Sequence, residues 1–250
     1  MKRDELTAYL DDYMGTYTMQ DYSDNGLQVE GAGEVHRLAL AVDANQQTID
    51  AAIAAGAQML IVHHGLFWGK PLRLTGPHRR RVKALLSADC SLYAIHLPLD
   101  CHLEVGNNVQ LARLLNLSVR GGFAETLGVP IGVVADARAG MSRDALASRL
   151  GEVLGVAPLL LPGGPPSVRR VAIISGGAAQ DIALAAAEGC DTFITGETSH
   201  SHYYDAAEYG INVLFGGHYA TETVGLKALA EHLERQFRLS WEFIDRPTGL

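Results

Sequence analysis

The chain has 250 residues, of which 48% are hydrophobic and 19% charged, and its formal net charge is −8. This composition is typical of a globular protein that buries a sizeable core as one large domain or two lobes. The acidic balance argues against a dedicated nucleic-acid surface, and no stretch approaches the roughly 18 apolar residues of a membrane span. Three cysteines without C-x-x-C spacing fit a reducing cytoplasm, so any metal should be held by nitrogen and oxygen.

The first quarter of the chain predicts a helix, a turn and a strand-helix-strand unit. Residues 1–15 alternate charged and apolar side chains as an amphipathic helix does, and they lack the apolar core of a signal peptide. Asp24 and Asn25 lie in "SDNGLQ", where "NG" predicts a turn. The strand "MLIVHHG" ends in His63 and His64, at the edge of an α/β sheet where ligand-bearing residues collect.

The predicted elements that follow also alternate between helices and strands. Residues 78–90 predict a helix whose basic start, "HRRRVK", is most simply a solvated face. Residues 91–100 predict a strand that contains His96 and ends at Asp100, and residues 107–117 predict another helix. Strands over 128–136 and 157–164 flank a helix that Ser142 would cap. Residues 211–217 predict a strand, and residues 218–237 a helix with an apolar stripe.

An internal repeat organises these elements. Residues 37–65 and 170–198 align without a gap, and each copy reads as a strand, a helix rich in alanine that ends at glycine, and a second strand. The alignment places Gly196 opposite His63 and Glu197 opposite His64. The repeat predicts an α/β fold of duplicated β-α-β-α units in two interlinked lobes, residues 1–124 and 125–250, with a site between them.

Five side chains at the predicted strand ends form a candidate metal site. His218 and Glu222 have i, i+4 spacing, which places them on one face of a helix. One catalytic metal normally needs three protein ligands and an open position, whereas two bridged metals would use all five. The adjacent imidazoles of the first copy could share a site only if the strand is already turning, or if they serve different metals. The candidate ligands are His63, His64, Asp100, His218 and Glu222.

The segments "SDNGLQVEG", "IVHHGLFWG", "IHLPLDCHLEVGNN", "TGETSH" and "GGHYATETVG" resemble the signature segments of the Nif-three-like family, whose members are named GTP cyclohydrolase 1 type 2 homologues. The resemblance runs over the whole chain and matches the short bacterial form. It implies a dinuclear metal site with the same five residues as ligands. It also implies a duplicated α/β fold assembled as a toroidal homohexamer.

Several further residues carry open alternatives. Glu197 is either a general base or an ordinary strand-end carboxylate, and we favour the base because the repeat places it near the site. His96 is either a buried histidine bonded to the backbone or a residue that orients a ligand and moves protons. His200 and His202 in "SHSH" are further ligand or phosphate-binding candidates, although a solvated helix start fits His202 better. "SGG" at 175–177 is a weak signal for a phosphate loop.

Two functions from different classes fit this pattern. The first is a metal-dependent hydrolase acting on a nucleotide-like small molecule, for which the resemblance implies attack of hydroxide on the purine ring of GTP and release of formate. The second is a metal-loaded ring or scaffold that binds a protein or metabolite, because ligand spacing reports metal binding and not turnover. The two divalent ions could be zinc, iron, manganese, cobalt or nickel.

Overall fold

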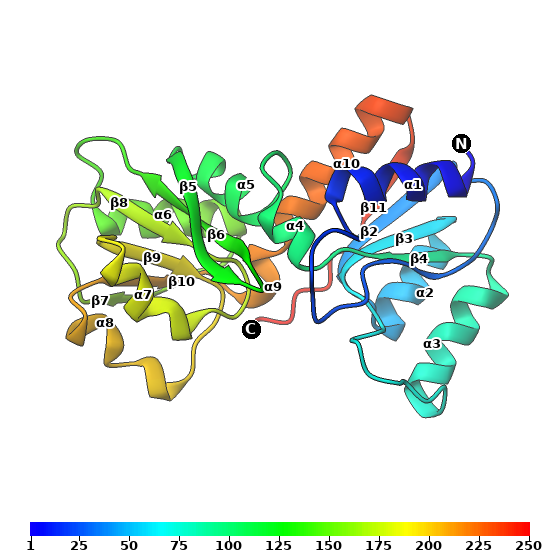
Figure 1. Cartoon of the computed structure of the whole chain (residues 1–250), viewed down its shortest axis with the longest axis horizontal. Helices are drawn as coiled ribbons and strands as arrows, with labels where there is room; N and C mark the ends of the chain where they lie inside the picture. The colour runs from blue at the N-terminus through cyan, green and yellow to red at the C-terminus, as the bar shows by residue number, and fades with distance from the viewer. The chain divides into compact units, whose positions relative to one another are not determined.

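The computed structural model describes residues 1–250, which form two compact units (Figure 1). The first unit comprises Met1–Val105 and Leu226–Arg246, and the second comprises Gly106–Gly225 and Pro247–Leu250. Each unit contains one multi-stranded sheet with helices, which confirms the predicted α/β fold class. None of the helices combines the length and the apolar character that crossing a membrane requires.

The sheet of the first unit has five strands in the order β1-β4-β3-β2-β11. The neighbouring strands from β4 to β11 pair in parallel, and β1 pairs antiparallel with β4. The strands are β1 (Gly26–Val29), β2 (Arg37–Asp43), β3 (Met59–His64), β4 (Ser91–Ala94) and β11 (Ser240–Phe243). The helices are α1 (Arg3–Met14), α2 (Gln46–Ala54), α3 (Gly76–Ser87), α4 (Leu97–Cys101) and α10 (Thr223–Phe237), the last of which begins in the second unit.

Helices cover both faces of this sheet. α2 and α3 lie on one face, where Ile49 and Leu85 pack against Leu60 and Val62 in one apolar cluster, and α1 and α10 lie on the other (Figure 1). Because successive strand residues point to opposite faces, a strand covered on both sides must be apolar throughout. This explains why β3 is an unbroken buried run up to its histidines.

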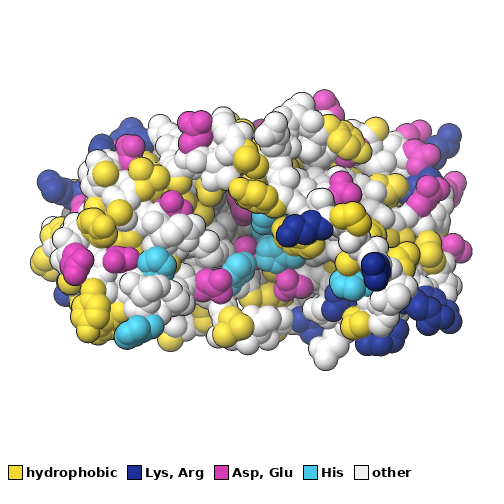
Figure 2. Space-filling view, turned by 60° about the horizontal axis from the view of Figure 1, so that its bottom comes forward, with side chains coloured by type: hydrophobic (Ala, Val, Ile, Leu, Met, Phe, Trp, Pro, Cys, Tyr) yellow, Lys and Arg dark blue, Asp and Glu magenta, His cyan; other side chains and the backbone are white.

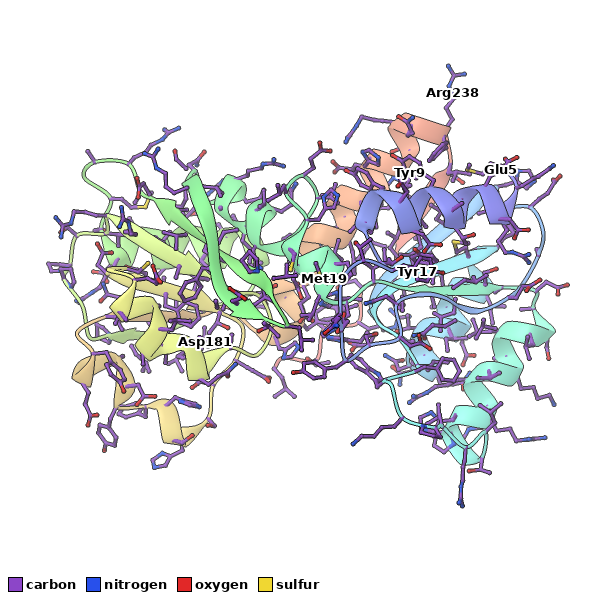
Figure 3. The ribbon with its side chains drawn as sticks, in the orientation of Figure 1. Glu5, Tyr9, Tyr17, Met19, Asp181 and Arg238 are labelled. Atoms are coloured by element: carbon purple, nitrogen blue, oxygen red, sulfur yellow. The ribbon has the colours of Figure 1, made fainter.

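An aromatic contact joins α1 to α10 within the first unit. The Tyr9 hydroxyl lies 2.6 Å from Nε2 of His232, and its ring meets Phe237 edge-on at 4.7 Å between centroids. Figure 3 shows Tyr9 on the side of α1 that faces α10. An aromatic edge-to-face pair contributes about 0.5–1.5 kcal/mol beyond its buried area, so Tyr9 helps to fix α10 on the sheet.

The sheet of the second unit has six strands in the order β5-β6-β8-β9-β10-β7. β8, β9 and β10 are parallel, and the remaining pairs are antiparallel. The strands are β5 (Ser118–Thr126), β6 (Val129–Asp136), β7 (Leu159–Pro162), β8 (Arg170–Ile173), β9 (Thr192–Thr195) and β10 (Asn212–Phe215). The helices are α5 (Asn107–Leu114), α6 (Arg143–Leu154), η1 (Ala179–Asp181), α7 (Ile182–Ala187), η2 (His200–His202), α8 (Asp205–Glu208) and α9 (His218–Thr221).

The sequence repeat corresponds to a structural repeat. β2-α2-β3 in the first unit matches β8-α7-β9 in the second, and each closing strand pairs in parallel with the next strand of its sheet. In the second unit, one apolar cluster joins α5 and α6 to the sheet, and another joins α7 and α8 to it. The duplicated units therefore share a core of three consecutive parallel strands, whereas the outer strands differ between them.

Two predicted elements have other bounds in the structure than the sequence pattern indicated. The strand predicted over residues 91–100 stops at Ala94. Pro98 lies in the first turn of α4, where backbone N–H groups make no hydrogen bond within the helix, so that a proline is tolerated. Asp100 is therefore a helical residue, and His96 precedes the helix. The helix predicted over 218–237 is interrupted at Glu222, which separates α9 from α10.

The basic run of the sequence forms an exposed face, as predicted. Arg79, Arg80 and Lys83 on α3 are exposed, and Figure 2 shows basic side chains gathered over this helix. No ion pair forms between these side chains and a carboxylate. The solvated-face interpretation is therefore sufficient for this segment.

The predicted cap of α6 is present and gives a stability test. The Ser142 hydroxyl accepts a hydrogen bond from the Ala145 amide at 3.1 Å. We expect Ser142→Ala to lower the free energy of unfolding by about 1 kcal/mol, measured by urea unfolding followed by circular dichroism. Ser142→Thr keeps the hydroxyl and should lose much less. Equal losses in both variants would contradict the capping role.

Candidate metal centre

Three imidazoles lie together at the ends of β3 and β4. The ring centroids of His63 and His64 are 4.8 Å apart, and those of His63 and His96 are 5.1 Å apart. One ring nitrogen from each of the three lies within 4.8 Å of the others. The two adjacent histidines thus share one cluster because β3 ends at His64 and the chain turns there. We refer to His63, His64 and His96 as the histidine cluster.

Each imidazole of the histidine cluster is held at its Nδ1 atom by a hydrogen-bond acceptor. Nδ1 of His63 donates to the Ile95 carbonyl at 2.9 Å, because a carbonyl oxygen can only accept. Nδ1 of His64 lies 2.9 Å from Asp43, and Nδ1 of His96 lies 2.8 Å from Asp21. In the neutral rings this pattern places the proton on Nδ1 and the lone pair on Nε2. Ring orientation by an acceptor of this kind is typical of metal-binding histidines.

A carboxylate lies beside the histidine cluster. Oδ2 of Asp100 is 3.5 Å from Nε2 of His63, and both side chains are largely buried. The short helix α4 places Asp100 there, because one helical turn after β4 returns the chain toward the end of the sheet. The first unit therefore combines three imidazole nitrogens and one carboxylate, which is a nitrogen and oxygen donor set.

The segment "QDYSDN" anchors His96 to the sheet. The Asp21 carboxylate accepts hydrogen bonds from the His96 ring, the Asn25 amide and the backbone N–H groups of Ser23 and Leu97. Burial raises the pKa of Asp21, but the hydrogen bonds and the attraction of His96 outweigh it and hold that pKa at about 2. Asn25 also accepts from the His96 backbone N–H at 2.8 Å. The structure assigns no turn to Asp24 and Asn25, and β1 begins directly after them at Gly26. Asn25 instead helps to fix the position of His96.

The turn after His64 tolerates no side chain at Gly65. A Cβ atom there would lie 2.5 Å from the amide of Gln28 and 2.6 Å from Ala94. The same Gln28 amide accepts from the Leu66 N–H at 2.7 Å, which ties the turn to β1. Trp68 then lies against the cluster, with its ring 5.1 Å from His96 and 5.9 Å from His64. Gly65 is therefore required by close packing behind the histidines.

The second unit carries a smaller cluster built around His218. Nε2 of His218 lies 3.1 Å from Glu222, which confirms the predicted i, i+4 contact, and Nδ1 lies 3.1 Å from Glu197. The hydrogen bond to Glu222 is the largest cause that raises the pKa of His218, and the negative charges of both carboxylates raise it further. Burial lowers this pKa, and the net result is a pKa of about 9. Glu197 thus occupies at His218 the place that Asp43 and Asp21 occupy in the first unit.

The "SGG" segment makes room for these carboxylates. A Cβ on Gly176, whose φ of +68° also disfavours other residues, would lie 2.4 Å from Oε1 of Glu222. A Cβ on Gly177 would lie 2.9 Å from Oε1 of Glu197. Two carboxylates against this loop disfavour a bound phosphate. The structure therefore gives the glycines a different role from the phosphate loop that the sequence hinted at.

The donor atoms of both clusters fit divalent metal ions. Imidazole and carboxylate ligands suit zinc and other first-row transition metals, and His63, Asp100 and Glu222 are buried, where a charge requires a partner. A metal site also requires its ligands to be held in a fixed orientation, and the hydrogen bonds at the Nδ1 atoms provide it. A metal at His218 would replace the proton that Nε2 shares with Glu222.

Sequence reasoning missed Asp43 and Asp21. Asp43 ends the strand "RLALAVD" and pairs in register with His64 on the parallel neighbour, so an acidic residue closing the adjacent strand was an available signal. Asp21 left no such signal, because its contact with His96 spans 75 residues of sequence.

The two histidines of the segment "SHSH" lie on the turn after β9. Nδ1 of His202 donates to Asp205 at 2.9 Å, and His200 is exposed on η2.

These features define a class of duplicated α/β proteins that carry histidine and carboxylate clusters at strand ends. The family model Duf34/NIF3 (NGG1p interacting factor 3) matches residues 1–248, and the chain belongs to this family. A GTP cyclohydrolase 1 type 2 homolog from Deinococcus radiodurans is 45% identical over 248 residues, which cover 99% of this chain and 94% of that protein. A Pyrococcus abyssi protein of the same name is 44% identical over the full length of both chains.

Solved structures show the same fold. The protein ybgI, described as of unknown function, matches with a TM-score of 0.94 at 40% identity over the full length of both chains. A crystal structure from Thermus thermophilus matches with a TM-score of 0.88 at 44% identity, again over both full lengths. HcgD from Methanocaldococcus jannaschii matches with a TM-score of 0.86 at 26% identity over 98% of each chain.

The acceptor at His64 provides a test of ligand orientation. We expect Asp43→Ala to weaken metal binding by roughly 10- to 100-fold, because His64 loses the acceptor that fixes its ring. Competition with a chromogenic chelator measures this affinity. Asp50→Ala, at an exposed carboxylate on α2 in the same unit, is the matched control. If the two variants bind metal equally well, Asp43 does not orient a ligand.

His218 provides a test in the metal-free protein. Its folded-state pKa of about 9 lies above the ordinary value of 6.5, so the stabilisation from its protonated ring is complete below about pH 6.5. That stabilisation is lost as the pH rises through about 9. We expect an NMR titration of the His218 ring to show this raised pKa and Glu197→Gln to lower it. Glu188→Gln, at an exposed carboxylate of the same unit, should leave the titration unchanged.

Proposed function

We propose that this chain is a metal-dependent hydrolase with a dinuclear centre. The observation that carries the proposal is the histidine cluster, in which every Nδ1 is bonded to an acceptor and a buried carboxylate lies alongside. Structural histidines need no such common orientation, whereas metal ligands do. The proposed ligands are His63, His64, Asp100, His218 and Glu222.

The number of ligands supports two ions acting as one centre. The first unit contributes three of the five ligands and the second contributes two, so neither unit alone supplies the whole set. A single catalytic metal normally uses three protein ligands, and five ligands with shared carboxylates match two ions. We therefore propose that these five residues bind two divalent ions.

The remaining polar residues have roles in orientation and proton transfer. A divalent ion, when bound, lowers the pKa of a coordinated water toward about 7 and so supplies a nucleophile at neutral pH. Oε1 of Glu197 accepts a hydrogen bond from Nδ1 of His218. The other carboxylate oxygen, Oε2, can therefore take a proton from water or substrate. His96, fixed by Asp21, presents Nε2 as a second proton-exchanging atom. Both residues act on protons beside the ligands.

The substrate proposal comes from the relatives. Those at 42–45% identity are named GTP cyclohydrolase 1 type 2 homolog, and we carry to this chain a nucleotide-like substrate and hydrolytic opening of its purine ring with release of formate. The mixed nitrogen and oxygen ligands accept zinc, iron, manganese, cobalt or nickel, and the supply of metal in the cell decides among such ions.

We also propose a homohexamer and a cytoplasmic setting. The toroidal hexamer is carried over from the resemblance to the family, and we expect light scattering on the eluting protein to give six times the chain mass of 26.8 kDa. The three cysteines, Cys90, Cys101 and Cys190, are all free thiols, which fits a reducing compartment.

Metal content tests the centre directly. We expect about two ions per chain by plasma mass spectrometry of gently purified protein. We expect His63→Ala in the first unit and Glu222→Ala in the second each to lower the content, whereas His36→Ala, at an exposed histidine, should not. An unchanged metal content in His63→Ala or Glu222→Ala would show that the substituted residue is not a ligand.

Activity is tested separately with the loaded protein. Formate release from GTP, abolished by His63→Ala, would support the hydrolase. A metal-loaded protein that stays silent across nucleotide and phosphoester panels would leave the second function, a metal-containing scaffold, in its place.

A further inference from the structure

A small cavity opens beside Glu197 in the second unit. Its volume is about 190 Å³, and it lies between the loop after β8 and the turn after β9. The lining includes Gly177, Gln180, Glu197, Thr198, Ser199 and His202. Every lining residue belongs to the second unit, so the cavity is complete within it. We refer to it as the Glu197 pocket.

The polar side chains of the Glu197 pocket offer acceptor atoms to a ligand, because several of their donor groups are engaged within the protein. One N–H of the Gln180 amide donates to Asp181, at the start of α7 (Figure 3), which leaves its second N–H and its carbonyl oxygen. Nδ1 of His202 donates to Asp205, which leaves Nε2 with a lone pair. The Thr198 hydroxyl donates to the Ser199 carbonyl and keeps its lone pairs. A hydroxyl group, which both donates and accepts hydrogen bonds, therefore suits this lining.

The charge of the Glu197 pocket selects against anions and does not demand a cation. No lysine or arginine lines it, and Glu197 is its one carboxylate. Because Oε1 of Glu197 already pairs with His218, part of its charge is balanced within the protein. A phosphate would meet an uncompensated carboxylate oxygen, whereas a neutral hydroxyl can donate to it. The sequence hypothesis of phosphate binding by His202 is not favoured here.

The size of the Glu197 pocket limits the ligand to a fragment. Pockets for whole drug-sized ligands measure about 300–1,000 Å³, and this one is smaller. The wall at Gly177 presents bare backbone, because a Cβ there would collide with Glu197. Vicinal hydroxyls match these features, since each hydroxyl donates one hydrogen bond and a carboxylate oxygen commonly accepts from ribose hydroxyls.

We propose that the Glu197 pocket binds the vicinal diol of a ribose-type sugar, so that a ribonucleoside substrate is held by its sugar beside His218. This inference rests on the proposed nucleotide-like substrate and names the part of it that the second unit recognises. Thr198 and Gln180 are then specificity-determining residues. Neither is a proposed metal ligand, so recognition of the sugar can be separated from metal loading.

Calorimetric titration of the metal-loaded protein tests the proposal. The probes are the four ribonucleoside triphosphates and their 2′,3′-dideoxy counterparts, which lack only the diol. We expect at least one ribonucleotide to bind about tenfold more tightly than its dideoxy form, as loss of about two hydrogen bonds to the pocket predicts. Thr198→Val combined with Gln180→Leu should remove this preference. Tyr204→Phe, at an exposed residue outside the pocket, should keep it.

Metal content, measured on every variant, keeps this result distinct from the proposed hydrolase. Full metal loading with a lost ribose preference in Thr198→Val/Gln180→Leu supports the proposal, whether or not any nucleotide is turned over. The proposal is overturned if none of the four pairs shows a preference for the ribose form. It is equally overturned if the preference persists in the double variant, because the diol would then be read elsewhere.

Discussion

Orientation of imidazole rings by hydrogen-bond acceptors is the constraint on which the rest of this site depends. Without an acceptor, a histidine at a strand end rotates and exchanges tautomers, and its lone pair has no fixed direction. Here a carbonyl holds His63, and carboxylates hold His64, His96 and His218. The fold supplies these acceptors from neighbouring strands and from the segment before β1, so that the arrangement of the sheet orients the candidate metal ligands.

Close packing behind the site imposes the second requirement. Gly65 must have no side chain because Gln28 and Ala94 already fill that space, and Gly176 must have none because Glu222 lies against its backbone. Both glycines follow the end of a parallel strand, where the chain leaves the sheet. A substitution at Gly176 would press on Glu222, whereas one at Gly65 would press on Gln28 and on Ala94 of the apolar core.

Duplication gave the two units the same scaffold and different chemistry. The strand that ends in His63 and His64 in the first unit ends before Gly196 and Glu197 in the second. In the first unit the strand end itself bears imidazoles. In the second, Glu197 supports an imidazole that comes from α9, and it also lines a pocket. One copy thus concentrates candidate metal ligands, and the other combines candidate ligands with a pocket that we propose binds a neutral polar group.

The sequence by itself determined the α/β class, the repeat and the local contact between His218 and Glu222, because strand periodicity, helix spacing and glycine placement are local properties. It also placed the cap at Ser142, which depends on residues three apart. Only the tertiary structure decided that His96 precedes a helix, that Asp21 reaches it across 75 residues, and that Asp43 lies beside His64. Such contacts depend on strand order and register, which the packing of distant segments fixes and no local pattern encodes.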